Sequence, residues 1–339
     1  MSDAPVTVVI PLFNKAREIS RALDSVCSQS SAPDTILVVD DGSTDEGPAI
    51  VQAYDDPRIR LIRQSNAGPG PARNRGITEA ETALVALIDA DDEWLPGFLE
   101  TVLQLRSRFP QAGLWAANYR MVPEESGAGA ECLSPRFGGL SSPLPQAPLL
   151  IDDFFRCLDG DCPVCASNVL GRRSVFLELG GFSGETRIGE DWDMWFRIAL
   201  KYPIAFTPSV QAVYRLDASN RAMHLGQKSP GVGTLLGTMT FENSIRQSLA
   251  GSELQPPYRA SVERLLARQL VLHAKAAIVM GRGSAARGLL TEARALNRVR
   301  EHWVRLWVQS FLGVSVNRIL NLGRRVEVSL RRTVRRGRR

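Results

Sequence analysis

The chain has 339 residues, of which 44% are hydrophobic, and a formal net charge of +5. This length and apolar content allow one large domain, or a domain with an appendage. No apolar run approaches the roughly 18–20 residues of a bilayer-spanning helix, and the amino terminus has no basic flank leading into an apolar stretch. We therefore expect a cytoplasmic chain without a signal peptide.

The positive charge is concentrated at the carboxyl terminus. From Arg298 to Arg339, twelve arginines accompany Glu301 and Glu327, a balance of +10 that leaves a net −5 for the preceding residues. Within this segment, helical spacing relates Trp303, Leu306, Trp307, Ser310 and Phe311. The pattern favours a peripheral contact with an anionic membrane surface at the cytoplasmic face. The alternative is an amphipathic helix that packs on the rest of the protein. Nucleic acid is not expected, because the body is acidic.

The first part of the chain alternates strand and helix patterns. Buried apolar runs predict strands at 6–13, 36–41, 59–62 and 84–88. Helices are expected from Lys15, capped by Asn14, then after Asp45, and out of the glycine-rich stretch 66–76. This alternation argues for a parallel sheet covered on both faces.

The pattern after residue 90 is less regular. It predicts a helix over 97–109, a strand over 114–121, a poorly anchored loop over 124–148 and a short helix over 151–158. Further expectations are an extended 167–170, a helix from Ser174 to Gly180, a helix opening at 189–197 and an extended 204–216. From about residue 240 the pattern is helical. We expect a first domain over 1–222 and a helical region with a basic tail over 223–339.

Three carboxylates follow the strand expected at 84–88. Asp89 and Asp91 are two residues apart, so in extended backbone they would face the same side. Close carboxylates repel, and a hard cation such as Mg²⁺ or Mn²⁺ relieves that repulsion. The alternative is an acidic helix amino terminus opened by Pro96.

Two common nucleotide-binding motifs are absent from the sequence. There is no Gly-x-Gly-x-x-Gly after the first strand and no Gly-x-x-x-x-Gly-Lys-Ser/Thr. Asp40, at a strand end, could accept a hydrogen bond from a base, and Arg73 could meet a phosphate. Asp89 and Asp91 could hold a metal that bridges a diphosphate. This combination fits an activated sugar donor.

Five segments carry a resemblance to a known family. They are Val-Val-Ile-Pro-Leu-Phe-Asn at 8–14, Val-Val-Asp-Asp-Gly-Ser-Thr-Asp at 38–45, Asn-Ala-Gly-x-x-x-Ala-Arg-Asn-x-Gly at 66–76, Asp-Ala-Asp-Asp at 89–92 and Gly-Glu-Asp-Trp-Asp at 189–193. In this order, over about residues 5–220, the chain resembles glycosyltransferase family 2, whose members have the GT-A fold. The resemblance implies an α/β fold with a single Rossmann-like, mixed, mainly parallel sheet flanked by helices. The residues after it would form a C-terminal helical extension.

The resemblance also implies an activity. The chain would be an inverting, metal-dependent transferase that uses Mg²⁺ or Mn²⁺. It would move a sugar from a nucleoside-diphosphate sugar, with UDP expected, to a hydroxyl of a saccharide or lipid-linked acceptor. Cell-surface polysaccharide or glycolipid assembly is the setting that the family suggests.

The family's roles transfer to residues that match its motifs. Pro11, Phe13 and Glu18 would border the nucleoside, Asp40 would bind the base, and Arg73 would lie near the diphosphate. Asp89 and Asp91 would hold the metal, with Asp91 as direct ligand and Asp92 supporting it or touching the sugar. The implied catalytic base is Asp191, and the implied acceptor contacts are Glu190, Trp192 and Trp195.

Simpler interpretations accompany these roles. Acidic residues at 190–191 also suit a helix amino terminus, and Trp192 and Trp195 could belong to the core. Asn14 and Asn74 could be caps or turn residues. The remaining candidates are a zinc site or plain packing at Cys157, Cys162 and Cys165, and a metal ligand or a solvent-exposed histidine at His224.

Two rival functions stay open. One is a catalytically silent nucleotide-sugar-binding scaffold, although the metal and base carboxylates of an active enzyme are present. The other is a nucleotidyltransferase of similar fold, which would want a basic, glycine-rich loop after the first strand. Residues 12–15 supply one lysine and no glycine. A polymerising synthase is disfavoured, because it would normally need membrane spans.

Overall fold

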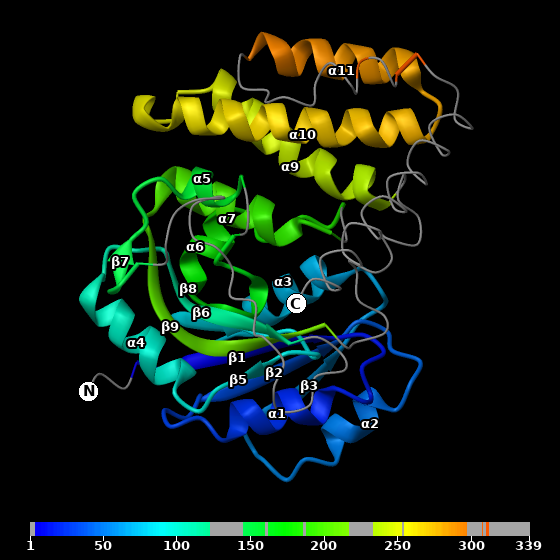
Figure 1. Ribbon diagram of the computed structural model, residues 1–339. Helices are drawn as coiled ribbons and strands as arrows, with labels where there is room; N and C mark the ends of the chain where they lie inside the picture. The colour runs from blue at the N-terminus through cyan, green and yellow to red at the C-terminus, as the bar shows by residue number, and fades with distance from the viewer. Residues whose placement is uncertain are drawn as a thin grey trace, which may run out of the picture.

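A computed structural model shows an α/β protein with a nine-stranded sheet in its described residues (Figure 1). The structure describes residues 4–122, 145–159, 162–185, 188–216, 233–252, 254–296, 307 and 310–311, without the side chains of 233–239. The strands are β1 (Val6–Leu12), β2 (Thr35–Asp40), β3 (Ile59–Arg63), β4 (Leu84–Leu87), β5 (Glu93–Trp94), β6 (Leu114–Val122), β7 (Leu149–Leu150), β8 (Val169–Arg172) and β9 (Ile204–Arg215).

The sheet is mixed, and its longest ladders are parallel. Its order is β3-β2-β1-β4-β8-β6-β9-β5, with β7 paired to β9. β1 pairs in parallel with β2 and β4, and β2 with β3, as does β6 with β9. β8 runs antiparallel between β4 and β6, and the short β5 and β7 are antiparallel to β9. The predicted α/β class with a mainly parallel sheet is confirmed.

Helices cover both faces of the sheet. They are α1 (Ile19–Cys27), α2 (Gly47–Gln52), α3 (Pro69–Glu79), α4 (Phe98–Arg108), α5 (Phe154–Cys157), α6 (Arg173–Glu178), α7 (Glu190–Lys201), α9 (Gly233–Ala250), α10 (Arg259–Val279) and α11 (Gly283–Ala295), with 3-10 turns η1 (Ala166–Asn168) and η2 (Pro256–Tyr258). Because strand side chains alternate, Val8 of β1 packs with α1 and α4 while Val9 packs with α3. Figure 1 shows the two layers.

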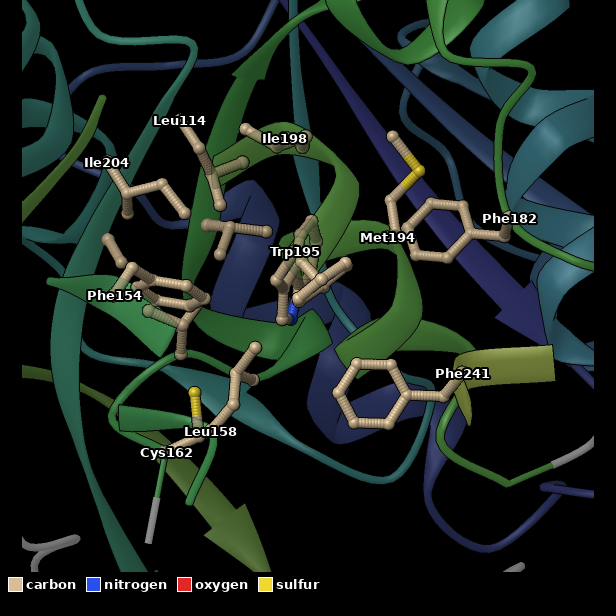
Figure 2. Close-up of a cluster of buried hydrophobic side chains, with 14 of the residues drawn as sticks. Leu114, Phe154, Leu158, Cys162, Phe182, Met194, Trp195, Ile198, Ile204 and Phe241 are labelled. Atoms are coloured by element: carbon tan, nitrogen blue, oxygen red, sulfur yellow. The ribbon is translucent and has the colours of Figure 1, made fainter. Parts of the chain in front are cut away.

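Helices α9, α10 and α11 stack beyond α7 (Figure 1). Phe241 of α9 and Val262 of α10 belong to the same buried cluster as Trp195 of α7 and Phe154 of α5 (Figure 2). A smaller cluster joins α10 to α11, and Trp307 packs against it. Among the helices of the described residues, none has both the length and the hydropathy of a membrane span.

The structure corrects several expectations about local geometry. Helix α1 begins at Ile19 rather than Lys15, because Asn14 has a left-handed φ of 51°. Its side chain accepts a hydrogen bond from the Thr44 amide instead of capping a helix. The helix predicted over 97–109 is confirmed as α4, whereas β5 and β7 were not predicted.

Four expectations fall partly or wholly outside the described residues. The described residues do not include the proposed domain boundary at 222, His224 or most of the loop predicted over 124–148. Of the tail stripe, Trp307, Ser310 and Phe311 are described, and Arg287 of α11 lies over the Phe311 ring at 4.4 Å. The membrane contact stays a prediction.

Glycine 76 is required where α3 crosses β1. A Cβ at Gly76 would lie 2.3 Å from Cγ1 of Val9, a stiff side chain on a central strand. Gly76→Ala should therefore lower the free energy of unfolding by about 1–3 kcal/mol, the range for overpacking. The control is Gly288→Ala in α11, where a Cβ would meet nothing within 4 Å. Alanine's helix propensity should leave that variant unchanged or more stable by up to about 1 kcal/mol. Urea denaturation measures both, and equal losses would contradict the packing argument.

Candidate functional site

The carboxyl ends of three parallel strands meet at one edge of the sheet. Leu12 is in register with Asp40, and Val9 with Leu87, so the chain leaves β1, β2 and β4 on the same side. Open α/β sheets bind ligands at this edge. The loops after β1 and β2 are tied together, since the Asn14 amide donates to Ser43 Oγ at 3.0 Å.

Residues 89–92 form a tight acidic turn after β4. The Asp92 amide donates to the Asp89 carbonyl at 3.0 Å, so Asp89 and Asp91 converge through a turn and not through the extended backbone that we expected. One carboxylate oxygen from each of Asp89, Asp91 and Asp92 lies within 4.8 Å of the others. Within the residues that the structure describes, this is the one group of side chains spaced to hold a metal ion.

Asp91 faces a lysine from the loop after β1. Lys15 Nζ lies 2.8 Å from Asp91 Oδ2, and the side chains are 11% and 9% exposed. The backbone carbonyl of Asp91 also accepts a hydrogen bond, from Arg21 Nη2 of α1 at 2.9 Å. The Asp91 carboxylate is thus paired with a cation of the protein, and its expected role as a metal ligand stays a prediction.

Asp92 is fixed from two distant parts of the chain. Its Oδ2 accepts from Ser167 Oγ at 2.6 Å and its Oδ1 from the Arg215 amide at 2.9 Å, and the residue is fully buried. Ser167 Oγ also accepts from the Asp89 amide at 3.1 Å. These contacts fix the Asp92 carboxylate within the turn, and both roles expected for it, supporting the metal or touching the sugar, stay predictions.

Arg73 of α3 bridges the acidic turn to the start of α7. Its Nη2 donates to Asp89 Oδ1 at 2.6 Å and its Nη1 to Glu190 Oε1 at 2.8 Å. The guanidinium also lies over the Phe182 ring at 5.4 Å, and Arg73 is 3% exposed. Both terminal nitrogens therefore serve carboxylates of the protein, and the expected approach of Arg73 to a diphosphate stays a prediction.

Asp191 stands in the first turn of α7. Gly189 before the helix has φ 80°, a conformation that favours glycine, and the helix amino terminus favours the acids at 190 and 191. Burial raises the pKa of Asp191 to about 7, and the neighbouring negative charge of Glu190 adds to the rise. Arg73 and a hydrogen bond from the Trp192 amide oppose it. A carboxyl with a pKa near neutrality suits a general base.

The residues expected around the nucleoside lie at the same edge. Asp40 is 4% exposed, and its Oδ1 accepts from the Ser43 amide at 2.9 Å. Phe13, at 39% exposed, presents a ring at the surface. Pro11 in β1 and Glu18 before α1 are half-buried. Their approach to a nucleoside stays a prediction.

The two tryptophans expected to contact an acceptor differ. Trp195 is fully buried among Phe176, Phe182 and Met194, so it belongs to the core and offers no surface to an acceptor (Figure 2). Trp192 is half-buried and makes an edge contact with Phe241 of α9.

The cysteine cluster favours packing over zinc. Cys157 and Cys162 are buried, and burial raises the pKa of the Cys162 and Cys165 thiols well above the usual value. No cysteine group in the described part of the chain is spaced to hold a metal.

Sequence reasoning missed the partners of the acidic turn. Lys15 entered as the start of a helix and as a lone basic residue, and was not linked to Asp91. Ser167 and Arg215 contact Asp92 across 75 and 123 residues of chain. No periodicity or motif links positions so far apart. Only the placement of Lys15 directly after the first matched motif could have drawn attention to it.

Residues 7–126 match the model of the family described as "Glycosyl transferase family 2". The succinoglycan biosynthesis protein ExoU of Rhizobium meliloti (strain 1021) is 29% identical over 280 residues, which cover 76% of this chain and 73% of that protein. An uncharacterized glycosyltransferase of Rickettsia felis is 28% identical over 205 residues, or 60% of this chain. The chain spans about a third of that relative, 32% of its length.

Solved structures match over nearly the whole chain. Residues 1–349 of S. aureus TarS in complex with UDP-GlcNAc superpose with a TM-score of 0.67 at 16% identity, covering 91% of this chain and 89% of that one. The complex of the same protein with UDP gives a TM-score of 0.62. At this identity the likeness shows the fold alone, and the expected GT-A fold is confirmed.

The bridge through Arg73 can be tested by stability. Arg73→Met should lower the free energy of unfolding by about 3–5 kcal/mol, because it leaves the buried Glu190 carboxylate without its cation. Adding Glu190→Gln should recover part of that loss. Arg60→Met is the control, since Arg60 pairs with Glu81 at 3.6 Å on an exposed surface and should matter by at most about 1 kcal/mol. Similar losses for Arg73→Met and Arg60→Met in urea denaturation would refute the bridge as a stabilising contact.

Proposed function

The chain belongs to glycosyl transferase family 2 through residues 7–126, and on that premise we propose that it is an inverting, metal-dependent glycosyltransferase. It would move a sugar from a nucleoside-diphosphate sugar to a hydroxyl of an acceptor. The donor we propose is a UDP-sugar, and the neighbouring TarS structures with UDP-GlcNAc and UDP support it.

One observation carries the proposal. Arg73 holds an acidic turn and the acidic start of α7 within one hydrogen-bonded unit, through Asp89 and Glu190. Asp89 is also among the charges that raise the pKa of Asp191. A transferase of this kind needs a place for the leaving diphosphate and a base for the acceptor in a single site, and this unit supports both.

Asp89 and Asp91 are the proposed metal ligands, with Asp92 as their support. Three carboxylate oxygens within 4.8 Å fit a hard divalent ion such as Mg²⁺ or Mn²⁺. When bound, the ion would neutralise charge on the departing nucleoside diphosphate.

Asp191 is the proposed base. A sugar hydroxyl attacks only as it loses its proton, and an ionised Asp191 would accept that proton. A single displacement by the acceptor inverts the anomeric carbon and needs no second carboxylate as nucleophile, unlike a retaining glycosidase. Of the residues expected near the acceptor, Glu190 pairs with Arg73, which leaves Trp192 as our proposed contact.

The acceptor we propose is a saccharide or lipid-linked saccharide in the assembly of a surface polysaccharide. The succinoglycan biosynthesis protein ExoU, which aligns with 76% of this chain, supports that class. The direct test is a screen of nucleotide sugars for thermal stabilisation and for donor hydrolysis, with and without Mn²⁺. Binding without any turnover across acceptors would favour the silent scaffold.

Asp91→Asn should abolish transfer and remove the Mn²⁺ dependence of donor binding while the fold survives, because a neutral amide is a poor ligand for a hard cation. Isothermal titration with UDP and Mn²⁺, together with a transfer assay, checks this. Asp56→Asn is the control, since Asp56 is a carboxylate paired with Arg58 outside the site. Full activity of Asp91→Asn with Mg²⁺ or Mn²⁺ would exclude the metal assignment.

Asp191→Asn should keep donor affinity and lower turnover by about 10²–10⁴-fold, the range of general-base contributions. In the wild type, kcat/KM should fall below pH about 7, because the pKa of Asp191 is raised to about 7 and the protonated carboxyl cannot act as a base. The variant should lack this acid limb. An equal loss of donor binding and turnover would assign Asp191 to the donor pocket.

The raised pKa of Asp191 also predicts that the stability of the protein depends on pH. The folded-state pKa of Asp191 lies above the ordinary aspartate value of 3.8, so the folded protein binds the proton more tightly than the unfolded chain. The contribution of Asp191 to stability therefore declines as pH rises from about 4 to about 7. The melting temperature of Asp191→Asn relative to wild type should rise over that interval and then level off. A pH-independent difference would contradict the raised pKa.

A further inference from the structure

Lys15 is held at the acidic turn by its backbone. The Lys15 carbonyl accepts from the amides of Glu18 and Ile19 at 3.1 and 2.9 Å, which ties it to the start of α1. The next amide, of Ala16, donates to Asp45 Oδ2 at 2.8 Å. The Cα of Lys15 is therefore fixed, and the flexible part is its side chain with four rotatable bonds.

The pair between Lys15 and Asp91 differs from an ordinary surface ion pair. At 2.8 Å, with both side chains nearly buried, the charges are poorly screened by solvent. The carboxylate partner is rigid, because Arg21 holds the Asp91 carbonyl and Ser167 holds Asp92. If one member of this pair moves, it is the ammonium group.

A divalent ion coordinated by Asp91 would meet this ammonium at close range. Two cations a few ångströms apart in a partly buried site repel strongly. A nucleoside diphosphate that arrives with the ion brings negative charge that can accept the displaced ammonium group. The ion alone brings none.

We propose that Lys15 is an exchangeable counter-ion: it neutralises Asp91 in the donor-free protein and yields that carboxylate to a divalent ion when a nucleoside diphosphate enters. The inference rests on the proposed function for the metal assignment to Asp91. It makes Lys15 a positioning residue that couples the two ligands, so that each tightens the binding of the other. Metal without nucleotide binds weakly, which keeps the acidic turn free of adventitious cations.

The test is a Mn²⁺ titration of the full chain, followed by electron paramagnetic resonance of free Mn²⁺, with and without UDP. Lys15→Met should bind Mn²⁺ without UDP roughly 5–150-fold more tightly than wild type, the usual range of such coupling. The enhancement of Mn²⁺ affinity by UDP should shrink correspondingly. Lys15→Arg, which keeps the positive charge, should resemble wild type.

Two controls define the site. Lys201→Met removes a lysine paired with Glu178 on an exposed surface and should not change Mn²⁺ affinity. Asp91→Asn in the Lys15→Met background should abolish the gain in affinity. Circular dichroism and melting temperature verify folding, and Lys15→Gln replaces Lys15→Met if the latter is unfolded.

Each outcome separates this inference from the proposed function. Unchanged or weaker Mn²⁺ binding by Lys15→Met overturns the counter-ion, even where UDP still tightens Mn²⁺ in wild type and supports a nucleotide-sugar site. Tighter Mn²⁺ binding by Lys15→Met without any effect of UDP in wild type supports the pairing of Lys15 with the metal carboxylate, but it overturns the coupling to UDP and, with it, the proposed UDP donor. Absence of Mn²⁺ binding in every variant overturns both.

Discussion

The burial of negative charge at one edge of the sheet governs this structure. Acidic side chains from the turn after β4 and from the start of α7 repel each other in a poorly solvated space unless a cation or a proton neutralises them. Arg73 supplies that cation to Asp89 and Glu190, which are 16 and 117 residues away in the chain. The guanidinium group suits the task, because its planar fork donates to two carboxylates at once and stays charged.

The glycine-rich stretch before and within α3 serves this placement. Gly70 lies against the Ser183 carbonyl and Gly76 against Val9, and a Cβ at either position would meet those atoms closer than 3.0 Å. Asn74 then exchanges two hydrogen bonds with the backbone of Phe182. The motif thus fixes α3 between β1 and the loop that precedes α7, and it positions Arg73 as a consequence. In this structure the motif packs closely against β1 and the loop before α7.

Sequence reasoning recovered what local patterns encode. Buried apolar runs identify β1 to β4, and the acids that follow Val39 and Ile88 locate the candidate site, because parallel strands end together. Contacts between distant segments could not be predicted, because nothing in the sequence relates Lys15 to Asp91 or Arg215 to Asp92. Asn14 was misjudged as a cap because its left-handed backbone depends on a neighbouring loop.

The two tryptophans of α7 show a finer limit of the same kind. Trp192 and Trp195 are three residues apart and face almost the same side of the helix, so periodicity cannot separate a surface residue from a core residue. The two differ in burial, because different elements pack against them. Trp195 lies against the aromatic side chains next to the sheet, while Trp192 meets Phe241 at the edge of α9.

The shared core between α5, α7, α9 and α10 has a consequence for how the protein folds. Phe241 and Ile245 pack into the same cluster as Phe196, and Ser244 donates to the Asp193 carboxylate. The helices after residue 233 are therefore part of the cooperative unit that buries α7. Loss of structure in α9 would expose the apolar side of the helix that carries Asp191. A substitution far from the sheet edge would then reach Asp191 through the melting of its support, so changes in these helices would resemble changes in the candidate site itself.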